Sequence, residues 1–299
     1  MSFCANQPAP GRYNHLIKKH PCFNGEAHAR FGRIHLPVSP ACNIRCRFCK
    51  RSLNKDENRP GVSSCLLTAQ EALETVERAL GLCTQITVAG IAGPGDTLAT
   101  GHALAAFRLI HQRFPHLINC LSTNGLRLPD KAREAAEAGV RTITVTMNGA
   151  DVDTVAKVCS CIVYRGQYLT GRSAAEKLLI SQQVGIRRAV DLGIAVKVNT
   201  VLIPGVNDHQ TGEVARLAAA AGAEFINVIP LIPQHEFAKY RAPDCQEMNA
   251  AREAAERHLP VFRHCRRCRA DACGIPGAGI DFAEQLYGQR EAATTFSHG

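Results

Sequence analysis

Short runs of β-branched and other apolar residues alternate along this chain with longer segments in which apolar residues recur at helical spacing. The short runs predict six strands and the longer segments predict six helices, joined by short connections. This alternation is typical of an α/β protein with a parallel sheet, either doubly wound or curled into a partial (β/α)6 barrel. The predicted strands span 33–38, 86–90, 117–122, 142–147, 195–201 and 225–229, and the predicted helices span 68–80, 102–113, 130–138, 173–192, 210–221 and 246–258.

Three of the predicted helices have recognisable ends. Thr68 is expected to cap its helix, because Glu71 follows three residues later as in a capping box. Gly139 and Gly193 stand where helix C-caps belong. We expect a barrel at 31–260, with a polar N-terminal extension at 1–30 and a C-terminal segment and tail at 261–299.

The carboxyl end of each predicted strand runs into a chemically unusual segment. In a β/α barrel these ends lie on one face, and that face carries the active site. Any one of these segments could be only a turn, because Gly, Pro and Asn form turns. Six of them on one face indicate a functional site. The segments are 39–42, 93–96, 122–125, 148–149, residue 199 with 204–208, and 230–233.

The composition limits the class of protein. Of the 299 residues, 45% are hydrophobic, which supports a substantial core and excludes an intrinsically disordered chain. No apolar run is long enough to span a bilayer, so no membrane partner is expected. The formal net charge of +9 is typical of proteins that bind nucleic acid or hold anionic cofactors and substrates.

The 14 cysteines are many for a chain of this length. They could form disulfides, zinc sites or iron–sulfur clusters. The N-terminus lacks the basic and then apolar pattern of a secretory signal, so we expect a cytoplasmic protein whose thiolates bind metal.

Cys42, Cys46 and Cys49 form a C-x3-C-x2-C run just after the first predicted strand. Three thiolates on one tight loop can hold three corners of a [4Fe–4S] cluster and leave the fourth iron open. A structural zinc site normally has four protein ligands, in two spaced pairs. The run, with the aromatic Phe48 before its last cysteine, resembles the radical S-adenosylmethionine (SAM) enzymes. That resemblance implies that the open iron binds the amino and carboxylate groups of SAM.

The glycine-rich segment at 90–96 follows the second predicted strand, where radical SAM enzymes have a motif that receives the SAM amino group. Glycine suits a close backbone approach to a ligand, although a glycine-rich turn alone is a weak signal. The resemblance implies a SAM pocket lined by Phe48, Gly93, Pro94, Gly95, Asp96, Ser122, Thr123, Asn124, Asn148 and Asn199.

Further motifs extend the likeness from about residue 19 to about residue 275. Together they resemble the NifB family, radical SAM proteins of nitrogenase cofactor biosynthesis. The motifs are His-Pro-Cys-Phe-Asn at 20–24, Arg-Ile-His-Leu-Pro-Val at 33–38, Asn-Arg-Pro-Gly at 58–61, Gly-Ile-Ala-Gly-Pro-Gly-Asp at 90–96, Leu-Ser-Thr-Asn-Gly at 121–125, Val-Leu-Ile-Pro-Gly-Val-Asn-Asp at 201–208 and Cys-Arg-Arg-Cys-Arg-Ala-Asp at 265–271.

The NifB resemblance implies a reaction on metal clusters, of the lyase or transferase type. Two [4Fe–4S] clusters are fused around a carbide that comes from a SAM methyl group, which gives the eight-iron precursor of the nitrogenase cofactor. A 5′-deoxyadenosyl radical from a second SAM abstracts hydrogen, and an extra sulfur comes from outside. The implied partners are a cluster donor, a carrier or scaffold protein and an electron donor such as ferredoxin or flavodoxin.

By the same resemblance, Cys22, Cys120, Cys265 and Cys268 hold two auxiliary clusters, with His20 as an imidazole ligand beside them. Other interpretations remain open: half of a zinc knuckle for Cys265 and Cys268, a core thiol for Cys120, and an exposed side chain for His20. Basic residues near these cysteines are expected to neutralise the anionic clusters, because nucleic-acid binding would call for aromatic residues among the charges. They are Arg45, Arg47, Arg263, Arg266, Arg267 and Arg269.

The chain departs from the NifB pattern at one position. Family members have a further cysteine between the SAM-cluster loop and residue 58, and here Asn54 stands near that place. Cys65, Glu57 or His20 could substitute, or one auxiliary cluster could be labile or absent. This departure leaves two alternatives open, a paralogue with a different substrate and a non-catalytic cluster scaffold.

The remaining cysteines are expected to be structural or incidental. By the resemblance, we expect a stand-alone form without the C-terminal carrier domain of many family members, and a separate protein that receives the product. The cysteines without an assigned role are Cys4, Cys83, Cys159, Cys161, Cys245 and Cys273.

Overall fold

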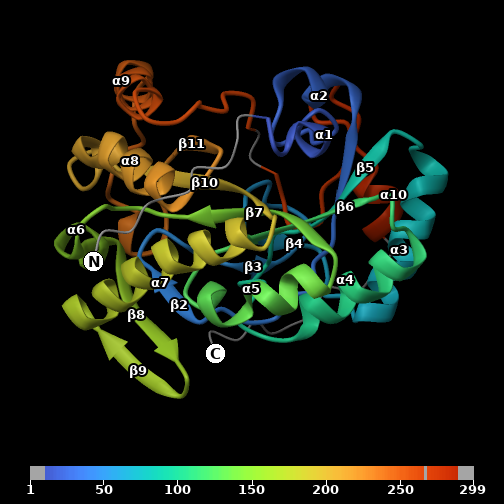
Figure 1. Ribbon diagram of the computed structural model, residues 1–299, viewed down its shortest axis with the longest axis horizontal. Coiled ribbons are helices and arrows are strands. Elements are labelled where there is room, and N and C mark those ends of the chain that lie inside the picture. The colour runs from blue at the N-terminus through green and yellow to red at the C-terminus, as the bar shows by residue number, and fades with distance from the viewer. Residues whose placement is uncertain (1–10, 266–267, 289–299) are drawn as a thin grey trace.

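The computed structural model describes residues 11–265 and 268–288. Its largest element is a seven-stranded sheet with the order β11-β10-β7-β6-β5-β1-β12 (Figure 1). Six strands are parallel and neighbour one another in chain order, whereas a doubly wound sheet would reverse its order at a switch point. The partial barrel is therefore confirmed. The strands are β1 (Gly32–His35), β5 (Ile86–Ile91), β6 (Ile118–Thr123), β7 (Val140–Thr146), β10 (Ala195–Leu202), β11 (Phe225–Pro230) and the antiparallel β12 (Cys273–Gly274).

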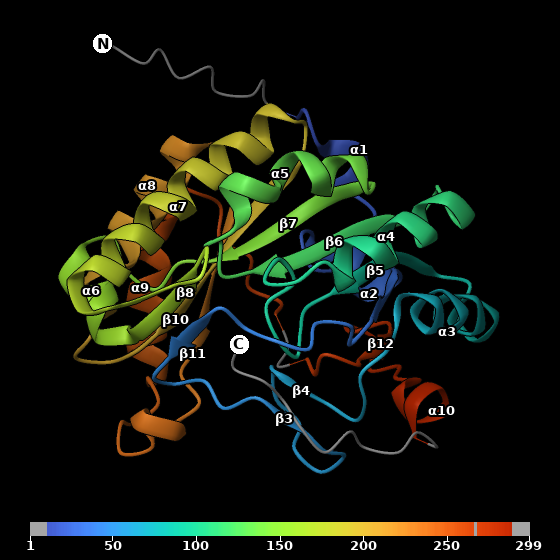
Figure 2. The ribbon, with the colours of Figure 1, turned by 90° about the horizontal axis from the view of Figure 1, so that it is seen from below.

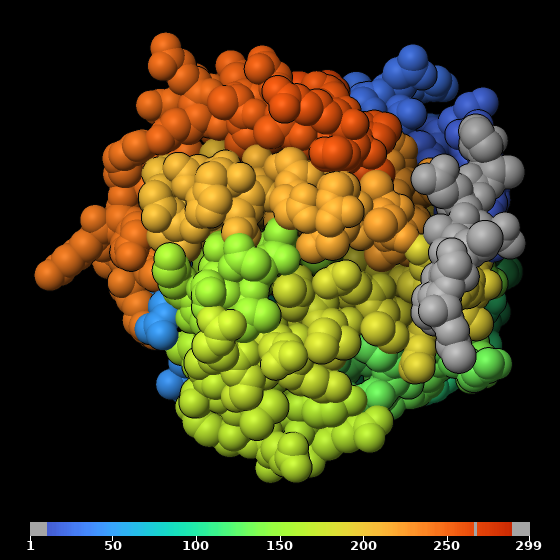
Figure 3. Space-filling view, turned by 60° about the vertical axis from the view of Figure 1, so that its left-hand side comes forward, coloured from blue at the N-terminus to red at the C-terminus, as the bar shows by residue number. Residues whose placement is uncertain are grey.

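All six predicted helices are present, with ends within a few residues of the prediction. Thr68 and Glu71 form a complete capping box, and Gly139 and Gly193 both have φ of +82° just after their helices. Figure 2 shows α5 and α7 on one side of the sheet and β3 and β4 on the other. In Figure 3 α7, α8 and α9 lie next to one another on the outer face. The helices are α3 (Ala69–Leu82), α4 (His102–Arg113), α5 (Leu128–Glu137), α7 (Gly171–Asp191), α8 (Thr211–Ala221) and α9 (Cys245–Glu256).

Several short elements were not predicted. An antiparallel sheet of β2 (Ile44–Cys46), β8 (Cys159–Tyr164) and β9 (Gln167–Thr170) stands beside the barrel, and β3 (Ser52–Leu53) pairs with β4 (Val62–Ser63). The small helices are α1 (Asn14–Ile17), α2 (Gly25–Arg30), α6 (Val152–Val158) and α10 (Ala283–Tyr287), and single 3-10 turns lie at Asp208–Gln210 and His235–Phe237.

The N-terminal extension, which was expected to be polar, buries several apolar side chains. Tyr13, Leu16 and Phe23 are buried and form one cluster with residues from the first half of β5, β6 and β10. The segment that contains α1 and α2 therefore covers the amino end of the barrel, where the strands begin.

Side chains alternate across the sheet, and the two faces differ in character. In β10, Val196 and Val198 belong to the main core with residues of α7, whereas Lys197 and Asn199 point to the other, concave side. Lys197 is only 3% exposed. A buried charge must be paired or face a charged ligand, so the concave side is suited to binding rather than to packing.

Within the part of the chain that the structure describes, no helix combines the length and apolar character that crossing a membrane requires.

Candidate functional site

The C-x3-C-x2-C loop is held by backbone hydrogen bonds at the carboxyl end of the barrel. Its middle forms β2, in which Cys46 lies opposite Cys159 of β8. The Arg47 amide donates to the Val158 carbonyl at 2.9 Å, and the Cys49 amide donates to the Cys46 carbonyl at 3.0 Å. These bonds place the three predicted cluster cysteines on one compact turn, with Cys42 and Cys46 buried.

The three thiols of this loop lie around the guanidinium of Arg51, a residue that sequence reasoning missed. Burial raises the pKa of the Cys42 and Cys46 thiols, while the nearby Arg51 charge acts to lower it. Burial alone would lower the pKa of Arg51, but the loop thiolates and Asp96 raise it above its usual value. A cation thus stands near these thiols, where it would stabilise negative charge on their sulfur atoms.

The predicted glycine-rich motif packs directly against this loop. The Gly95 amide donates to the Ser39 carbonyl at 2.8 Å, and the Asp96 amide donates to the Ala41 carbonyl at 2.9 Å. A Cβ atom at Gly95 would lie 2.1 Å from the Ala41 carbonyl oxygen. Glycine is therefore required here because two loops of the chain approach closely, and the Gly93–Pro94 peptide before it is cis.

Asp96 connects this turn to the end of β6. Its carboxylate accepts hydrogen bonds from the Asn124 amide at 2.6 Å, the Thr123 hydroxyl at 3.0 Å and the Leu98 amide at 3.0 Å. The Asn124 side-chain amide in turn donates to Asn43 Oδ1 at 2.7 Å. Burial raises the pKa of Asp96, although these donors oppose the shift. The network fixes the ends of β5 and β6 against the cluster loop.

The other predicted SAM-pocket residues occupy the same end of the barrel. Asn148 Oδ1 accepts from the Val201 amide at 2.9 Å, and Asn199 Oδ1 accepts from the Asn227 side chain at 3.2 Å. The Ser122 carbonyl accepts from the Thr97 hydroxyl at 2.6 Å. Phe48 packs against a separate apolar cluster that includes Phe237.

Buried polar atoms next to the loop indicate that it binds a ligand. Among residues 11–265 and 268–288, no three His, Cys, Asp or Glu side chains are arranged around one metal ion, as a zinc site would require. Two buried polar atoms next to the loop, Asn43 Nδ2 and Ser39 Oγ, have no hydrogen-bond partner. Buried polar groups without partners are unusual, so they indicate a ligand at this place.

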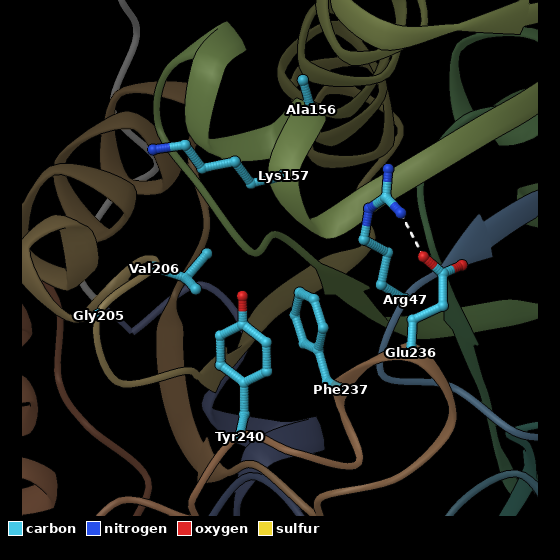
Figure 4. A pocket seen from close by; sticks show the side chains of 8 residues that line it. All are labelled: Arg47, Ala156, Lys157, Gly205, Val206, Glu236, Phe237 and Tyr240. Carbon is cyan, nitrogen blue, oxygen red and sulfur yellow. Dashed lines mark hydrogen bonds and ion pairs between the residues drawn. The ribbon is translucent and has the colours of Figure 1, made fainter.

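A pocket of about 660 Å³ opens beside the cluster loop (Figure 4). Arg47 and Lys157 supply positive charge to its wall, and Arg47 is paired with Glu236. The rings of Phe237 and Tyr240 lie 4.4 Å apart, and the Phe237 amide donates to the Arg47 carbonyl at 3.3 Å. The pocket is therefore coupled to the loop through its backbone.

A second group of cysteines lies deeper in the barrel. Cys120 stands two residues before Ser122 on the same side of β6, so the two are separated by about 7 Å along the strand. Cys22 shares a buried cluster with Cys120. Cys268 belongs to the C-terminal segment, and its sulfur accepts a hydrogen bond from Arg33 Nη2 at 3.2 Å. The structure thus brings together predicted residues that are far apart in the sequence.

Lys197 and Arg33 are the buried cations of this second group. Lys197 Nζ donates to the Cys22 carbonyl at 2.7 Å, and Arg33 is 5% exposed. Burial raises the pKa of the Cys22 thiol to about 12, while Lys197 and Arg33 oppose the shift. Burial likewise raises the pKa of Cys265, against the opposing effects of Lys197 and the Asn227 side chain.

Three of the arginines that were expected to neutralise the clusters, Arg47, Arg263 and Arg269, pair with carboxylates. Arg263 pairs with Glu256 at 2.6 Å, and Arg269 pairs with Asp271 at 2.8 Å. Arg45 is exposed on β2. Arg266 and Arg267 lie outside the described residues, as does Cys4. Arg33 Nη2 instead donates to Cys268 Sγ, and the charges of Arg51 and Lys197 act on nearby thiols.

His20 is buried beside this group. Its Nδ1 accepts a hydrogen bond from the Cys22 amide at 3.1 Å, which places the proton of the neutral ring on Nε2. Burial, together with Lys197 and His35, holds the pKa of His20 well below its usual value. Nε2 is buried and has no partner.

The position of the missing cysteine is occupied by a closed hydrogen-bond network. The Asn54 side-chain amide donates to Ser52 Oγ at 2.9 Å and to Glu57 Oε1 at 2.8 Å. Its oxygen accepts from the Asp56 amide at 3.1 Å and the Glu57 amide at 2.9 Å. All four hydrogen-bonding positions of Asn54 are used.

Two residues that could have replaced the missing cysteine have other roles. Glu57 is paired with Arg59 at 2.5 Å. Cys65 is 3% exposed and belongs to the main hydrophobic core.

Comparisons with known proteins agree with these features. A family model described as the Radical SAM superfamily matches residues 36–218. The FeMo cofactor biosynthesis protein NifB of Methanocaldococcus infernus is 42% identical over 267 residues, which cover 88% of this chain and 88% of that protein. The protein of the same name from Klebsiella pneumoniae is 41% identical over 266 residues, which cover 86% of this chain and 57% of that protein.

Solved structures share the fold at low sequence identity. A radical SAM methyltransferase from Sphaerobacter thermophilus is 22% identical, covers 77% of this chain and 65% of its own, and superposes with a TM-score of 0.56. This likeness supports the curled parallel sheet with its helices outside.

Proposed function

Because this chain belongs to the radical SAM superfamily and, within it, to the NifB family of FeMo cofactor biosynthesis proteins, we propose that it cleaves SAM to build that cofactor's precursor. The reaction that we propose joins two [4Fe–4S] substrate clusters around a carbide derived from a SAM methyl group. The observation that carries the proposal is the placement of two separate thiol groups inside one half-barrel. One lies near Arg51 at the carboxyl end. The other lies near Lys197 and Arg33, with Cys120 two residues before Ser122 on β6.

At the carboxyl end, Cys42, Cys46 and Cys49 would hold a [4Fe–4S] cluster, which when bound supplies the electron that cleaves SAM. Asn43 and Ser39 carry the buried polar atoms that a bound SAM would satisfy. Asp96 holds Asn124 and Thr123 in place through its carboxylate, so it orients this wall of the pocket. Arg51 offsets the charge of the thiolates.

Deeper in the barrel, the second thiol group would bind cluster substrate. Cys120 and Ser122 lie on the same side of β6, so a cluster on Cys120 would be next to the SAM pocket. The apolar cover formed by Tyr13, Leu16 and Phe23 closes the amino end and excludes water from this region. A reactive carbon transferred from SAM would thus meet the cluster in a closed interior.

The pocket beside the cluster loop suits a partner protein. Arg47 and Lys157 line it, and the exposed Arg45 stands on the neighbouring strand. We propose that an acidic electron donor of the ferredoxin or flavodoxin class docks here, and that the protein works in the cytoplasm with separate cluster-donor and carrier proteins. Electrostatic attraction of this kind increases the rate of association.

A second candidate function is a NifB-like paralogue with a different substrate. It is favoured by Asn54, whose closed network occupies the place where family members have a cluster cysteine. The first candidate function requires a complete set of ligands, provided either by this chain or by a partner.

One experiment separates the candidates. The chain is purified without oxygen, reconstituted with iron and sulfide, and incubated with SAM and dithionite. We expect both S-adenosylhomocysteine and 5′-deoxyadenosine, because the proposed reaction uses one SAM as methyl donor and another as radical source. Deoxyadenosine alone would favour the paralogue, and neither product would favour a scaffold.

The site assignment has its own test in the same assay. Cys42→Ala is expected to abolish both products, whereas Cys245→Ala, on the exposed start of α9, is expected to leave them unchanged. Product formation by Cys42→Ala would contradict the assignment.

A further inference from the structure

We propose that Cys46 and Cys159 are a redox-active pair of thiols, which form a disulfide when the cluster-free chain meets a peroxide. Cys159 takes no part in the proposed reaction, and it was expected to be structural or incidental. The inference rests on the proposed function in one respect, because it takes Cys46 as a ligand of the SAM-binding cluster.

The strand pairing places the two cysteines directly opposite each other. In the antiparallel pair of β2 and β8, Cys46 is the register partner of Cys159, and the bulge in this pairing lies on the side of Arg45. On the other side, the Arg47 amide donates to the Val158 carbonyl at 2.9 Å. Hydrogen-bonded and non-hydrogen-bonded pairs alternate along antiparallel strands, so Cys46 and Cys159 form a non-hydrogen-bonded pair.

Such a pair has the geometry that a disulfide needs. The Cα atoms of a non-hydrogen-bonded pair lie about 4.5 Å apart, and the two side chains leave the same face of the sheet. Disulfides join Cα atoms that are about 4.4–6.8 Å apart. Cys159 Sγ donates to the Cys161 carbonyl at 3.4 Å, a weak hydrogen bond that rotation of this side chain would break. The bond therefore requires side-chain rotation within the existing strand register.

Cys49 is the competing partner of Cys46. Its amide donates to the Cys46 carbonyl at 3.0 Å, so the turn of the cluster loop brings these two residues together as well. A bond between them would close a short loop, whereas a bond to Cys159 joins distant segments that the fold already holds together. A link across a long loop removes more conformational freedom from the unfolded chain, so it stabilises the folded chain more.

A small peroxide is the class of oxidant that fits this site. Cys46 is 9% exposed and Cys159 is 2% exposed, so a bulky oxidant has poor access to either sulfur. Arg47, the residue after Cys46, lines the pocket that opens beside the loop, which gives a small molecule a short path to Cys46 (Figure 4).

The reaction balances with hydrogen peroxide as the oxidant. One thiol takes an oxygen atom from the peroxide and becomes a sulfenic acid, and one water leaves. The second thiol then attacks this sulfur, and a second water leaves as the S–S bond forms. The two thiols together lose two electrons and two protons, and the peroxide is reduced to water.

The disulfide and the SAM-binding cluster exclude each other, because the thiolate of Cys46 is needed for both. The bond also stops the oxidation of Cys46 at a reversible stage, since a sulfenic acid that meets no thiol continues to sulfinic and sulfonic acids. A dithiol reductant restores both thiols by exchange. Cys159 thus keeps the cluster-free chain able to take up its cluster again.

The test maps the disulfide in the oxidised, cluster-free chain. The reduced chain is treated with hydrogen peroxide, alkylated with N-ethylmaleimide and digested with trypsin for mass spectrometry. Trypsin cleaves after Arg45 and Arg47, so Cys46 and Cys49 fall in separate peptides. We expect the Cys46 peptide linked to residues 158–165, and loss of this link with dithiothreitol. A Cys46–Cys49 link in its place, or no link to residues 158–165, would overturn the proposal.

Matched variants separate Cys159 from its neighbour. Cys159 and Cys161 lie in the same tryptic peptide, and both are buried residues of β8. We expect Cys159→Ala to lose the link and Cys161→Ala to keep it, and the opposite result would contradict the assignment. The link itself is measured in the parent chain, so the proposal stays testable if a variant does not fold.

The protective role has a separate measurement. After the same peroxide treatment followed by dithiothreitol, the Cys46 peptide of the parent chain should carry a free thiol. The same peptide of Cys159→Ala should carry sulfinic or sulfonic acid. Equal oxidation of Cys46 in the two chains would contradict the role of Cys159.

These measurements use the chain without its cluster and do not depend on catalysis. Absence of SAM products from the reconstituted chain would count against the proposed function. Absence of the Cys46–Cys159 link from the oxidised, cluster-free chain would count against the present inference.

Discussion

The substitution Asp96→Asn tests how the SAM pocket is held together. Asp96 is 4% exposed, and both of its oxygens accept hydrogen bonds. The Leu98 amide donates to one oxygen at 3.0 Å and the Asn124 amide donates to the other at 2.6 Å. Asparagine offers only one oxygen, so its NH2 group must face one of these two amides.

The expected loss follows from these contacts. One hydrogen bond to a charged group, worth about 1.5–3 kcal/mol, is removed. One buried amide is left without an acceptor, at a cost of about 1–3 kcal/mol. Relief of the buried charge, whose desolvation raises the pKa of Asp96, offsets part of this sum. We expect a net decrease of about 2–4 kcal/mol in the free energy of unfolding.

The assay is urea unfolding of the metal-free chain under reducing conditions, followed by circular dichroism. Asp56→Asn is the matched control, because Asp56 is exposed and lies in a surface turn. The control is expected to change stability by less than about 0.5 kcal/mol. A loss of less than about 1 kcal/mol for Asp96→Asn would refute the reasoning, because it would mean that the carboxylate does not fix the two strand ends.

Three further outcomes are expected. Gly95→Ala should prevent binding of the SAM-binding cluster, because the new Cβ would lie 2.1 Å from the Ala41 carbonyl oxygen. The iron content of the variant checks this, with Gly81→Ala as the control because Gly81 has open space around it. Arg51→Met should make the potential of the SAM-binding cluster more negative, and an unchanged potential would show that Arg51 is not its counter-charge. Burial acts to raise the pKa of Asp271, but Arg269 and Ser64 lower it overall. The ionised Asp271 carboxylate therefore stabilises the fold above its unfolded pKa of about 4, and this stabilisation is lost as pH falls through the folded pKa. Acid unfolding of Asp271→Asn should therefore lose less stability than wild type between about pH 5 and pH 2, and parallel curves would contradict this.

The barrel could be predicted because each predicted strand and helix carries its own periodic signal over five or more residues. The sheet of β2, β8 and β9 lacked such a signal. The hairpin between β8 and β9 reverses direction at Arg165 and Gly166, which both have positive φ. Arginine is uncommon at such a position in a turn of this type. The three residues of β2 form a strand only because β8 pairs with them.

The spacing of Cys42, Cys46 and Cys49 predicted that they share one loop, whereas the cations near the thiols could not be predicted. Arg33 and Lys197 each stand inside an apolar strand, and a charged residue at such a position was an available signal that the strand faces something other than a core. Arg51 belongs to an irregular segment, so only the folded loop brings it to the thiols. The convergence of Cys22, Cys120 and Cys268 likewise depends on tertiary packing of three distant segments.

The cover at the amino end of the barrel also bears on how metal enters. The helices α1 and α2 have four and six residues, too few to be stable without the contacts of Tyr13, Leu16 and Phe23. Opening of this short segment therefore costs far less than unfolding of the sheet. Cys22 lies between the two helices, so a metal bond to its sulfur would fasten the segment to the barrel. Proteolytic cleavage and amide hydrogen exchange in residues 13–31 should consequently slow when the cluster is in place, which makes the N-terminal segment a reporter of cluster loading.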